Sequence, residues 1–138
     1  MTASTTEGSR AFIAEAFAKW ARGEGDVFSL LADDVVWHIT GNDPAVSRTH
    51  RSRQALLDAA AVPLRERLAA PLKPEVKHIW ADGDDVIVQW DGTAPFPDGT
   101  QYRNTYLWIL TVCGSRIVEV TAFLDIPTFK AALARPRP

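Results

Sequence analysis

The chain has 138 residues, of which 46% are hydrophobic and 23% charged, a composition typical of a globular domain. Its formal charge of −2 argues against a dedicated nucleic-acid binder, and its single cysteine excludes an intrachain disulfide. No apolar run reaches the roughly 18 residues of a membrane helix, and the polar start is no signal peptide, so a cytoplasmic protein without membrane contact is expected. The length suits one domain, 1–138, with an ordered core at about 10–134.

The first half of the sequence has the pattern of helices around a single strand. Apolar spacings of three and four, β-branched runs and polar caps identify these elements. They are a helix over 12–20, a short helix over 27–31 begun by Asp26 and ended by Asp33-Asp34, a strand over 35–39, and a helix over 52–68 that Pro63 kinks or breaks.

The second half changes to the period of strands. Alternating and β-branched segments separated by hairpin-type clusters predict four antiparallel strands and a closing helix. The strands are expected at 74–81, 86–93, 101–112 and 117–124, and the helix at 127–134. This order predicts an α+β fold with its helices packed on one face of a curved sheet.

Alternation along the predicted strands separates a buried face from a second face. On the strand over 101–112, one face carries Tyr102, Asn104, Tyr106 and Trp108, and an aromatic face of this kind is expected to be buried. On the preceding strand, alternation alone puts Asp91 on the solvent side together with Gln89.

Three stretches of the chain resemble a known family. They are Leu30-Leu31-Ala32-Asp33-Asp34-Val35-Val36-Trp37-His38, Tyr102-Arg103-Asn104-Thr105-Tyr106-Leu107-Trp108, and Ile117-Val118-Glu119-Val120 followed by Phe123-Leu124-Asp125. The chain resembles the SnoaL-like and ketosteroid-isomerase-like branch of the nuclear transport factor two superfamily. The resemblance implies a cone-shaped, cystatin-like α+β barrel, in which a strongly bent, mostly antiparallel sheet and its helices surround a deep pocket. Members include cyclases, isomerases, dehydratases, hydrolases and non-catalytic binders.

Two catalytic patterns of that superfamily are incomplete in this sequence. The resemblance places the central aspartate of limonene epoxide hydrolase on Asp91, but its arginine falls on Gln89 and its base on Ala122. The base of ketosteroid isomerase falls near Ile39, which is apolar. Neither mechanism is therefore expected. The same alignment implies that Gln89 and Asp91 face the pocket, against the alternation.

The resemblance and the pocket chemistry together name three candidate catalytic residues. Asp91 would transfer the proton, and Tyr106 or Asn104 would polarise a substrate oxygen. The alternatives are a solvated strand residue for Asp91, a core tyrosine for Tyr106 and a structural hydrogen bond for Asn104. Second-rank candidates are His38, which alternation points away from Trp37, and Asp125, for which capping the last helix is the simpler role.

The expected ligand is a hydrophobic small molecule. The resemblance and the sequence patterns propose a set of binding residues: Phe17, Trp20, Trp37, Ile39, Leu57, Gln89, Trp108, Ala122 and Leu124. The leading hypothesis is a cofactor-free cyclase, isomerase, dehydratase or hydrolase acting by acid–base catalysis, and the alternative is a non-catalytic binding protein. No metal is expected, because the three histidines show no ligand spacing.

The second face of the predicted sheet is more apolar than a solvated face. It carries Leu107, Ile109, Ile117 and Phe123, and relatives of the resembled family commonly pair through the sheet. A homodimer through this outer face is therefore predicted. An interaction module with a filled pocket is the remaining alternative.

Overall fold

A six-stranded sheet forms the body of the protein, with the strand order β2-β1-β6-β5-β4-β3. The structure is a computed structural model and describes residues 2–138. Its strands are β1 (Leu31–Ile39), β2 (Thr49–His50), β3 (Lys73–Asp82), β4 (Asp85–Pro95), β5 (Gln101–Cys113) and β6 (Arg116–Leu124). Its helices are α1 (Thr2–Ala21), α2 (Arg53–Leu56), α3 (Val62–Arg67) and α4 (Ile126–Leu133), with a 3₁₀ turn η1 (Phe28–Leu30) and a π-helical segment η2 (Leu57–Ala61).

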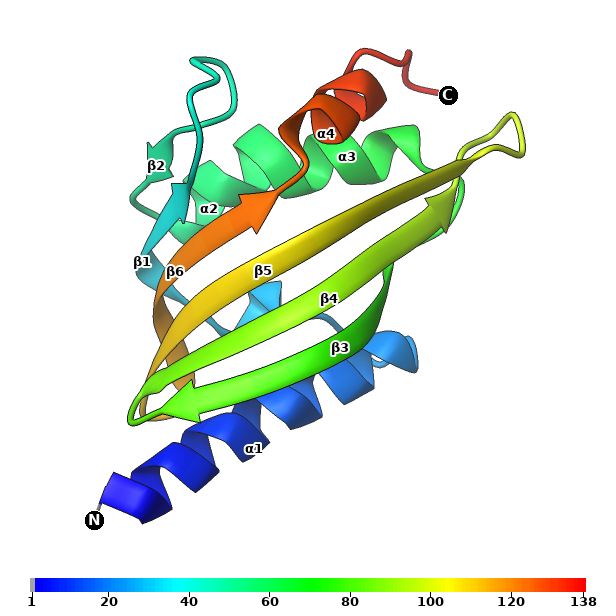
Figure 1. The fold of residues 1–138 in the computed structure, drawn as a ribbon. Coiled ribbons are helices and arrows are strands. Elements are labelled where there is room, and N and C mark those ends of the chain that lie inside the picture. The colour runs from blue at the N-terminus through cyan, green and yellow to red at the C-terminus, as the bar shows by residue number, and fades with distance from the viewer. Residues whose placement is uncertain (1) are drawn as a thin grey trace.

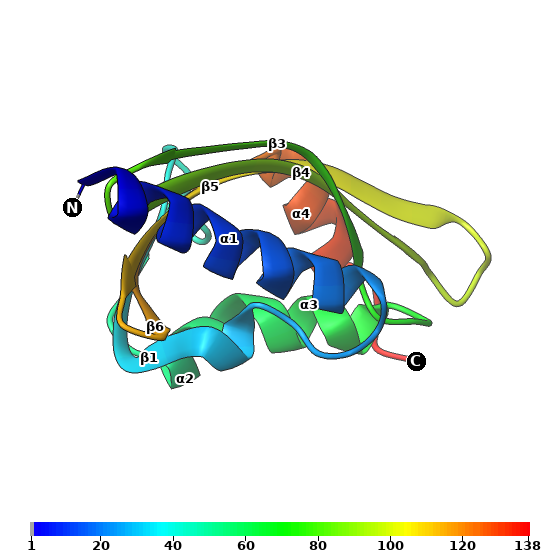
Figure 2. The same cartoon turned by 90° about the horizontal axis from the view of Figure 1, so that it is seen from below.

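The antiparallel meander predicted for the second half is confirmed. Strands β3, β4, β5 and β6 pair in chain order through the predicted turns, and β1 joins the sheet parallel to β6. The sheet is mixed and its edges β2 and β3 stay apart, so the cone is not a closed barrel. Figure 1 shows α1 alongside β3, and Figure 2 shows the sheet bending around α1 and α3. We call the helix-covered face of the sheet the inner face and the opposite one the outer face.

Three elements differ from the sequence expectations. Helix α1 begins at Thr2 rather than near residue 12, so it includes the polar start of the chain. Strand β1 begins at Leu31 and runs through the exposed Asp33-Asp34, and its parallel pairing with β6 shifts register between Leu31 and Val36. Before it, the short helix predicted over 27–31 is only the single 3₁₀ turn η1, Phe28–Leu30.

The predicted helix over 52–68 keeps helical backbone angles at both of its internal junctions, Leu56–Leu57 and Ala61–Val62. Its irregularity is the π-helical segment η2 in the middle, and α3 follows with Pro63 in its first turn. Ser52 caps the first part by accepting from the backbone N–H of Ala55. A π-helical turn often marks a functional site, and this one faces the inner side of the sheet.

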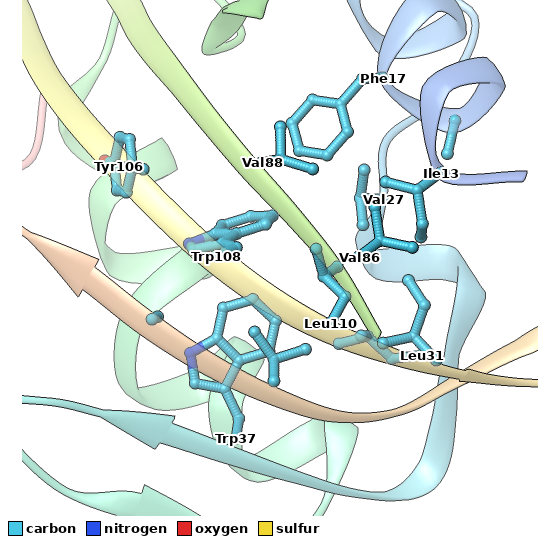
Figure 3. Packing of buried hydrophobic residues seen from close by; sticks show 14 of the residues in the cluster. Ile13, Phe17, Val27, Leu31, Trp37, Val86, Val88, Tyr106, Trp108 and Leu110 are labelled. Carbon is cyan, nitrogen blue, oxygen red and sulfur yellow. The ribbon is translucent and has the colours of Figure 1, made fainter. Parts of the chain in front are cut away.

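The main hydrophobic core lies between the inner face and α1. It contains Ile13 and Phe17 from the helix and Val86, Val88 and Leu110 from the sheet, and Figure 3 shows these side chains meeting. This packing fills the end of the sheet near the β3–β4 turn and leaves the end with the β4–β5 aromatic pair, Trp90 and Tyr106, to the site described next. In the described part of the chain, no helix combines the length and the hydropathy that a membrane span requires.

Candidate functional site

A cavity of about 170 Å³ lies between the inner face and the helical segment from α2 to α3. Eight of the residues expected at a ligand site line it: Trp20, Trp37, Ile39, Leu57, Tyr106, Trp108, Ala122 and Leu124. The sequence analysis missed further lining residues, among them Trp90 on β4 and Ala60 in η2. Trp90 could have been predicted from the sequence, because strand alternation puts it on the same face as Val86 and Val88.

The sheet side of the cavity carries several aromatic side chains, because neighbouring strands place rings in register. Trp90 lies directly opposite Tyr106, and their rings stack with centroids 4.2 Å apart. Trp37 and Trp108 meet edge to face at 5.0 Å, and Figure 3 shows both indole nitrogens on the side of their rings that lies toward Tyr106. Aromatic pairs in these geometries stabilise each other beyond the area they bury. The cavity therefore has firm, flat walls suited to a flat ligand.

Two residues expected at the cavity lie behind its wall. Phe17 is buried and packs on Trp90 and Trp108, with ring centroids 5.5 and 5.9 Å away. Asn104 is also buried, and its amide binds the backbone of Asp125 and the hydroxyl of Tyr102. Neither is among the described residues that line the cavity. Phe17 therefore affects the cavity through the Trp90 and Trp108 rings, and Asn104 through the groups to which it is hydrogen-bonded.

A short chain of neutral polar groups ends in the cavity. The hydroxyl oxygens of Tyr102 and Tyr106 lie 2.7 Å apart, and Asn104 Nδ2 donates to the Tyr102 hydroxyl at 3.0 Å. Burial raises the pKa of Tyr102, and burial together with Tyr102 raises the pKa of Tyr106 well above its ordinary value. Tyr106 therefore presents a neutral hydroxyl to a ligand at any physiological pH.

The expectation that Asp91 and Gln89 face the pocket is wrong. Asp91 is buried, but on the outer face, where its carboxylate accepts from Arg103 Nη2 at 2.8 Å and from Thr105 Oγ1 at 2.7 Å. Lys77 Nζ lies 3.8 Å from the same carboxylate. Strand alternation explains this, because Trp90 and Tyr106 point inward and their neighbours must point outward. Gln89 lies on the outer face for the same reason.

The second-rank candidates also lie away from the cavity. His38 points to the outer face, where Nε2 lies 3.0 Å from Glu119 Oε2 and Nδ1 lies 2.9 Å from Thr49 Oγ1. Asp125 caps α4 by accepting from the backbone N–H of Thr128. Asp26 is the one described lining residue that carries a carboxylate. It is exposed, and its carboxylate accepts a hydrogen bond from the backbone N–H of Ser29. The deep part of the site thus holds neutral groups.

Solved structures with the same fold cover almost the whole chain. One is a nuclear-transport-factor-2-like protein from Burkholderia thailandensis, with 18% identity, a TM-score of 0.67 and coverage of 93% of this chain and 98% of that one. Another is a candidate SnoaL-like polyketide cyclase from Jannaschia, with 17% identity, a TM-score of 0.69 and coverage of 96% and 95%. A third is IdmH, a candidate polyketide cyclase from Streptomyces antibioticus, with 22% identity, a TM-score of 0.66 and coverage of 92% and 99%. At these identities the likeness shows the fold alone.

Sequence comparison identifies the family. A search of curated proteins gives no match. The family model of the SnoaL-like domain matches residues 9–120, which include most of α1, the helical segment over the cavity and most of the sheet. The stretches of the sequence that resemble the family lie largely within this range, and the cone-shaped fold agrees with it. The chain therefore belongs to the SnoaL-like domain family.

Proposed function

We propose that the protein binds a flat, hydrophobic small molecule in the cavity on the inner face. The observation that carries this proposal is the cavity itself, about 170 Å³ in volume and lined by aromatic and aliphatic side chains. For scale, an apolar cavity of about 150 Å³ in another protein stays dry and accepts benzene. One or two rings of a ligand would occupy the cavity, and burial of apolar surface would supply most of the affinity.

The position of Asp91 makes binding a better supported function than acid–base catalysis. A general acid or base must lie within hydrogen-bonding reach of the substrate, directly or through one water. Asp91 lies on the outer face and is held by Arg103 and Thr105, with the sheet between it and the cavity. The proton-transfer role that the sequence suggested for Asp91 therefore lacks a geometric basis.

A catalytic role for the same cavity is the second candidate, and one observation favours it. Tyr106 is a buried, firmly hydrogen-bonded hydroxyl in an apolar site, and such donors stabilise a negative charge that develops on a substrate oxygen. Two structural neighbours are candidate polyketide cyclases, which adds weight to a cofactor-free cyclisation. In that case Tyr106→Phe would lower turnover by roughly 100- to 1000-fold, the usual effect of removing such a donor.

Binding of 2-ethylnaphthalene, followed by tryptophan fluorescence and calorimetry, tests the proposed function. Ala60 lines the cavity, and Ala59 beside it in η2 is exposed, so Ala60→Phe and Ala59→Phe form a matched pair. We expect the wild type and Ala59→Phe to bind equally and Ala60→Phe to bind at least about tenfold more weakly. Equal binding by all three proteins, or no binding by the wild type, would contradict the proposal.

We also propose that two copies of the chain pair through the outer face. This face carries what we call the outer apolar patch: Trp80, Ile87, Leu107, Ile109 and Phe123. The side chains of Trp80 and Phe123 are 48% and 42% exposed. Ile117, which the sequence analysis placed on this face, is fully buried on the inner face because a register shift between Thr111 and Val112 reverses the alternation of β6.

The mass of the protein in solution tests the pairing. A two-fold axis through the outer apolar patch would bring the same residues of both copies together, as in most homodimers. Phe123→Asp places a charge in the patch and should give a monomer by light scattering. Val76→Asp is the control, because Val76 is an exposed apolar residue opposite Trp90 on β3, away from the patch. A monomeric wild type at tens of micromolar would overturn the pairing.

A further inference from the structure

The hydrogen-bond chain behind the cavity has a direction that the backbone sets. Asn104 Oδ1 accepts from the backbone N–H of Asp125 at 3.0 Å, and Asn104 Nδ2 donates to the backbone carbonyl of Asp125 at 3.0 Å. A backbone N–H can only donate and a carbonyl can only accept, so these two bonds leave the amide a single orientation. The second proton on Asn104 Nδ2 therefore points to the hydroxyl oxygen of Tyr102.

The direction passes from Asn104 through Tyr102 to Tyr106. Tyr102 accepts from Asn104, and its own proton needs an acceptor because the side chain is 2% exposed. Among the described residues, the acceptor within reach of that proton is the hydroxyl oxygen of Tyr106, 2.7 Å away. The reverse direction would leave the Tyr102 proton in the core without a partner, at a cost of about 1–3 kcal/mol, whereas Tyr106 lines the cavity, where a ligand can accept its proton.

Tyr106 is then left with a free proton at the cavity. Its oxygen accepts from Tyr102, and no residue of the described chain lies in position to accept the proton of Tyr106 in turn. Tyr106 lines the cavity, so this proton is available to a ligand. Burial raises the pKa of Tyr106 and so keeps the proton in place at neutral pH.

Unpaired indole groups point to the same ligand chemistry independently. Trp90 and Trp108 line the cavity, and both Nε1 atoms are buried without a hydrogen-bond partner in the described structure. An indole N–H can only donate. The buried polar atoms of the lining that lack a hydrogen-bond partner are therefore all hydrogen-bond donors. Among the described lining residues, the side chain that can only accept hydrogen bonds is that of Asp26, which is exposed.

From this arrangement we infer that the cavity selects flat ligands whose buried oxygen only accepts hydrogen bonds, such as aryl ketones and quinones, over the corresponding alcohols and amines. The inference rests on the proposed binding function and deepens it. Tyr106 is the residue that contacts the ligand oxygen, and Tyr102 and Asn104 are positioning residues that fix which way its proton points. A ligand hydroxyl or amine brings a proton of its own, and that proton would be buried without an acceptor.

Three ligands of nearly the same shape test the selectivity: 2-acetylnaphthalene, 2-ethylnaphthalene and 1-(2-naphthyl)ethanol. A net hydrogen bond of about 0.5–1.5 kcal/mol predicts that the ketone binds roughly 2- to 12-fold more tightly than the hydrocarbon. The alcohol should bind more weakly than the ketone by at least about fivefold, because its proton is left unpaired. Equal affinities for all three would overturn the inference while leaving the proposed function intact, and binding of none would overturn the proposed function.

Two variants that each remove one oxygen test the roles of the tyrosines. Tyr106→Phe should keep the affinity for 2-ethylnaphthalene and abolish the preference for the ketone. Tyr102→Phe should keep the preference for the ketone over the hydrocarbon. It leaves the Tyr106 oxygen free to accept a hydrogen bond from the hydroxyl of the alcohol, so the alcohol should no longer bind more weakly than the ketone. Far-ultraviolet circular dichroism would establish that both variants are folded. If Tyr102→Phe weakens all three ligands by the same factor, Tyr102 is merely structural and the positioning role is wrong.

Discussion

The two faces of one sheet carry opposite kinds of chemistry in this protein. The inner face of β4 and β5 holds Trp90 and Tyr106, stacked in register and neutral. The outer face of the same two strands holds Asp91 and Thr105, directly opposite each other in the next register position and close to Arg103. A shift of a single position along the strand therefore separates a hydrophobic cavity wall from a charged cluster.

This difference follows from the cost of burying charge. An unpaired carboxylate in the aromatic cavity would lose its hydration without gaining an ionic partner there. On the outer face, Asp91 gains hydrogen bonds from Arg103 and Thr105, and the Arg103 side chain remains 64% exposed. The neutral chain of Asn104, Tyr102 and Tyr106 supplies the polarity of the inner side without a net charge. The fold thereby keeps the cavity apolar in a chain with 17 acidic residues.

The largest difference in stability is expected between substitutions of two tryptophans, one on each face of the sheet. Trp108 is 2% exposed in the inner wall, whereas Trp80 is 48% exposed on the outer face. Trp108→Ala should lower the free energy of unfolding by about 3–5 kcal/mol, because it removes a large buried side chain and leaves a void. Trp80→Ala should cost about 1 kcal/mol or less.

Urea unfolding at a protein concentration low enough to keep the chain monomeric measures both tryptophan effects. Similar losses for the two variants would mean that the outer face is as tightly packed as the inner one, and the contrast between the faces would fail.

The strand pattern of the sequence was sufficient to predict the architecture. The four strands of the meander and their turns follow from residues with local preferences, such as Asp82-Gly83-Asp84 between β3 and β4. Alternation also placed Asp91 correctly on the outer side of β4, and the alignment to a relative misplaced it. In this chain the periodicity of a strand was a better guide to side-chain direction than a distant resemblance.

The features that the sequence could not provide depend on tertiary contacts. The shift that turns Ile117 inward is a local insertion in the β5–β6 pairing, and no residue type marks it. The π-helical form of η2 was not predicted either, although Pro63 just after it favours an irregular helix. The orientation of Asn104 requires the backbone of Asp125, which is 21 residues away. Local propensity carries no information about any of these contacts.

An intermediate effect is expected for Asp91, which the sequence suggested as a catalyst. Asp91→Asn keeps the shape of the side chain but weakens the bonds to Arg103 and Thr105, so we expect a loss of about 1–2 kcal/mol in the free energy of unfolding. The affinity for 2-ethylnaphthalene should change by less than about twofold, since the cavity lies on the other face.

Asp85→Asn is the matched control for Asp91. Asp85 also accepts from a threonine, Thr111, across the same strand pair, but it is exposed, so the loss of stability should be smaller. A large drop in ligand affinity, or in turnover once a reaction is known, with Asp91→Asn alone would show that the outer face reaches the site.

The smallest effect concerns pH and the half-buried His50 on β2, which lies opposite Trp37 and so on the inner side. Burial, and then the charge of Arg48, lower the pKa of His50 below its ordinary value of about 6.5. Above that pH the imidazole is neutral in both the folded and the unfolded chain and contributes nothing. As the pH falls below about 6.5, the unfolded chain takes up the proton first, so stability is lost.

The stability advantage of the wild type over His50→Gln should therefore shrink between pH 8 and pH 5, by less than about 1 kcal/mol because the ring is partly solvated. Urea unfolding of both proteins at the two pH values measures this difference, and an advantage that grew toward acid pH would mean that the inner side of β2 favours the charged imidazole.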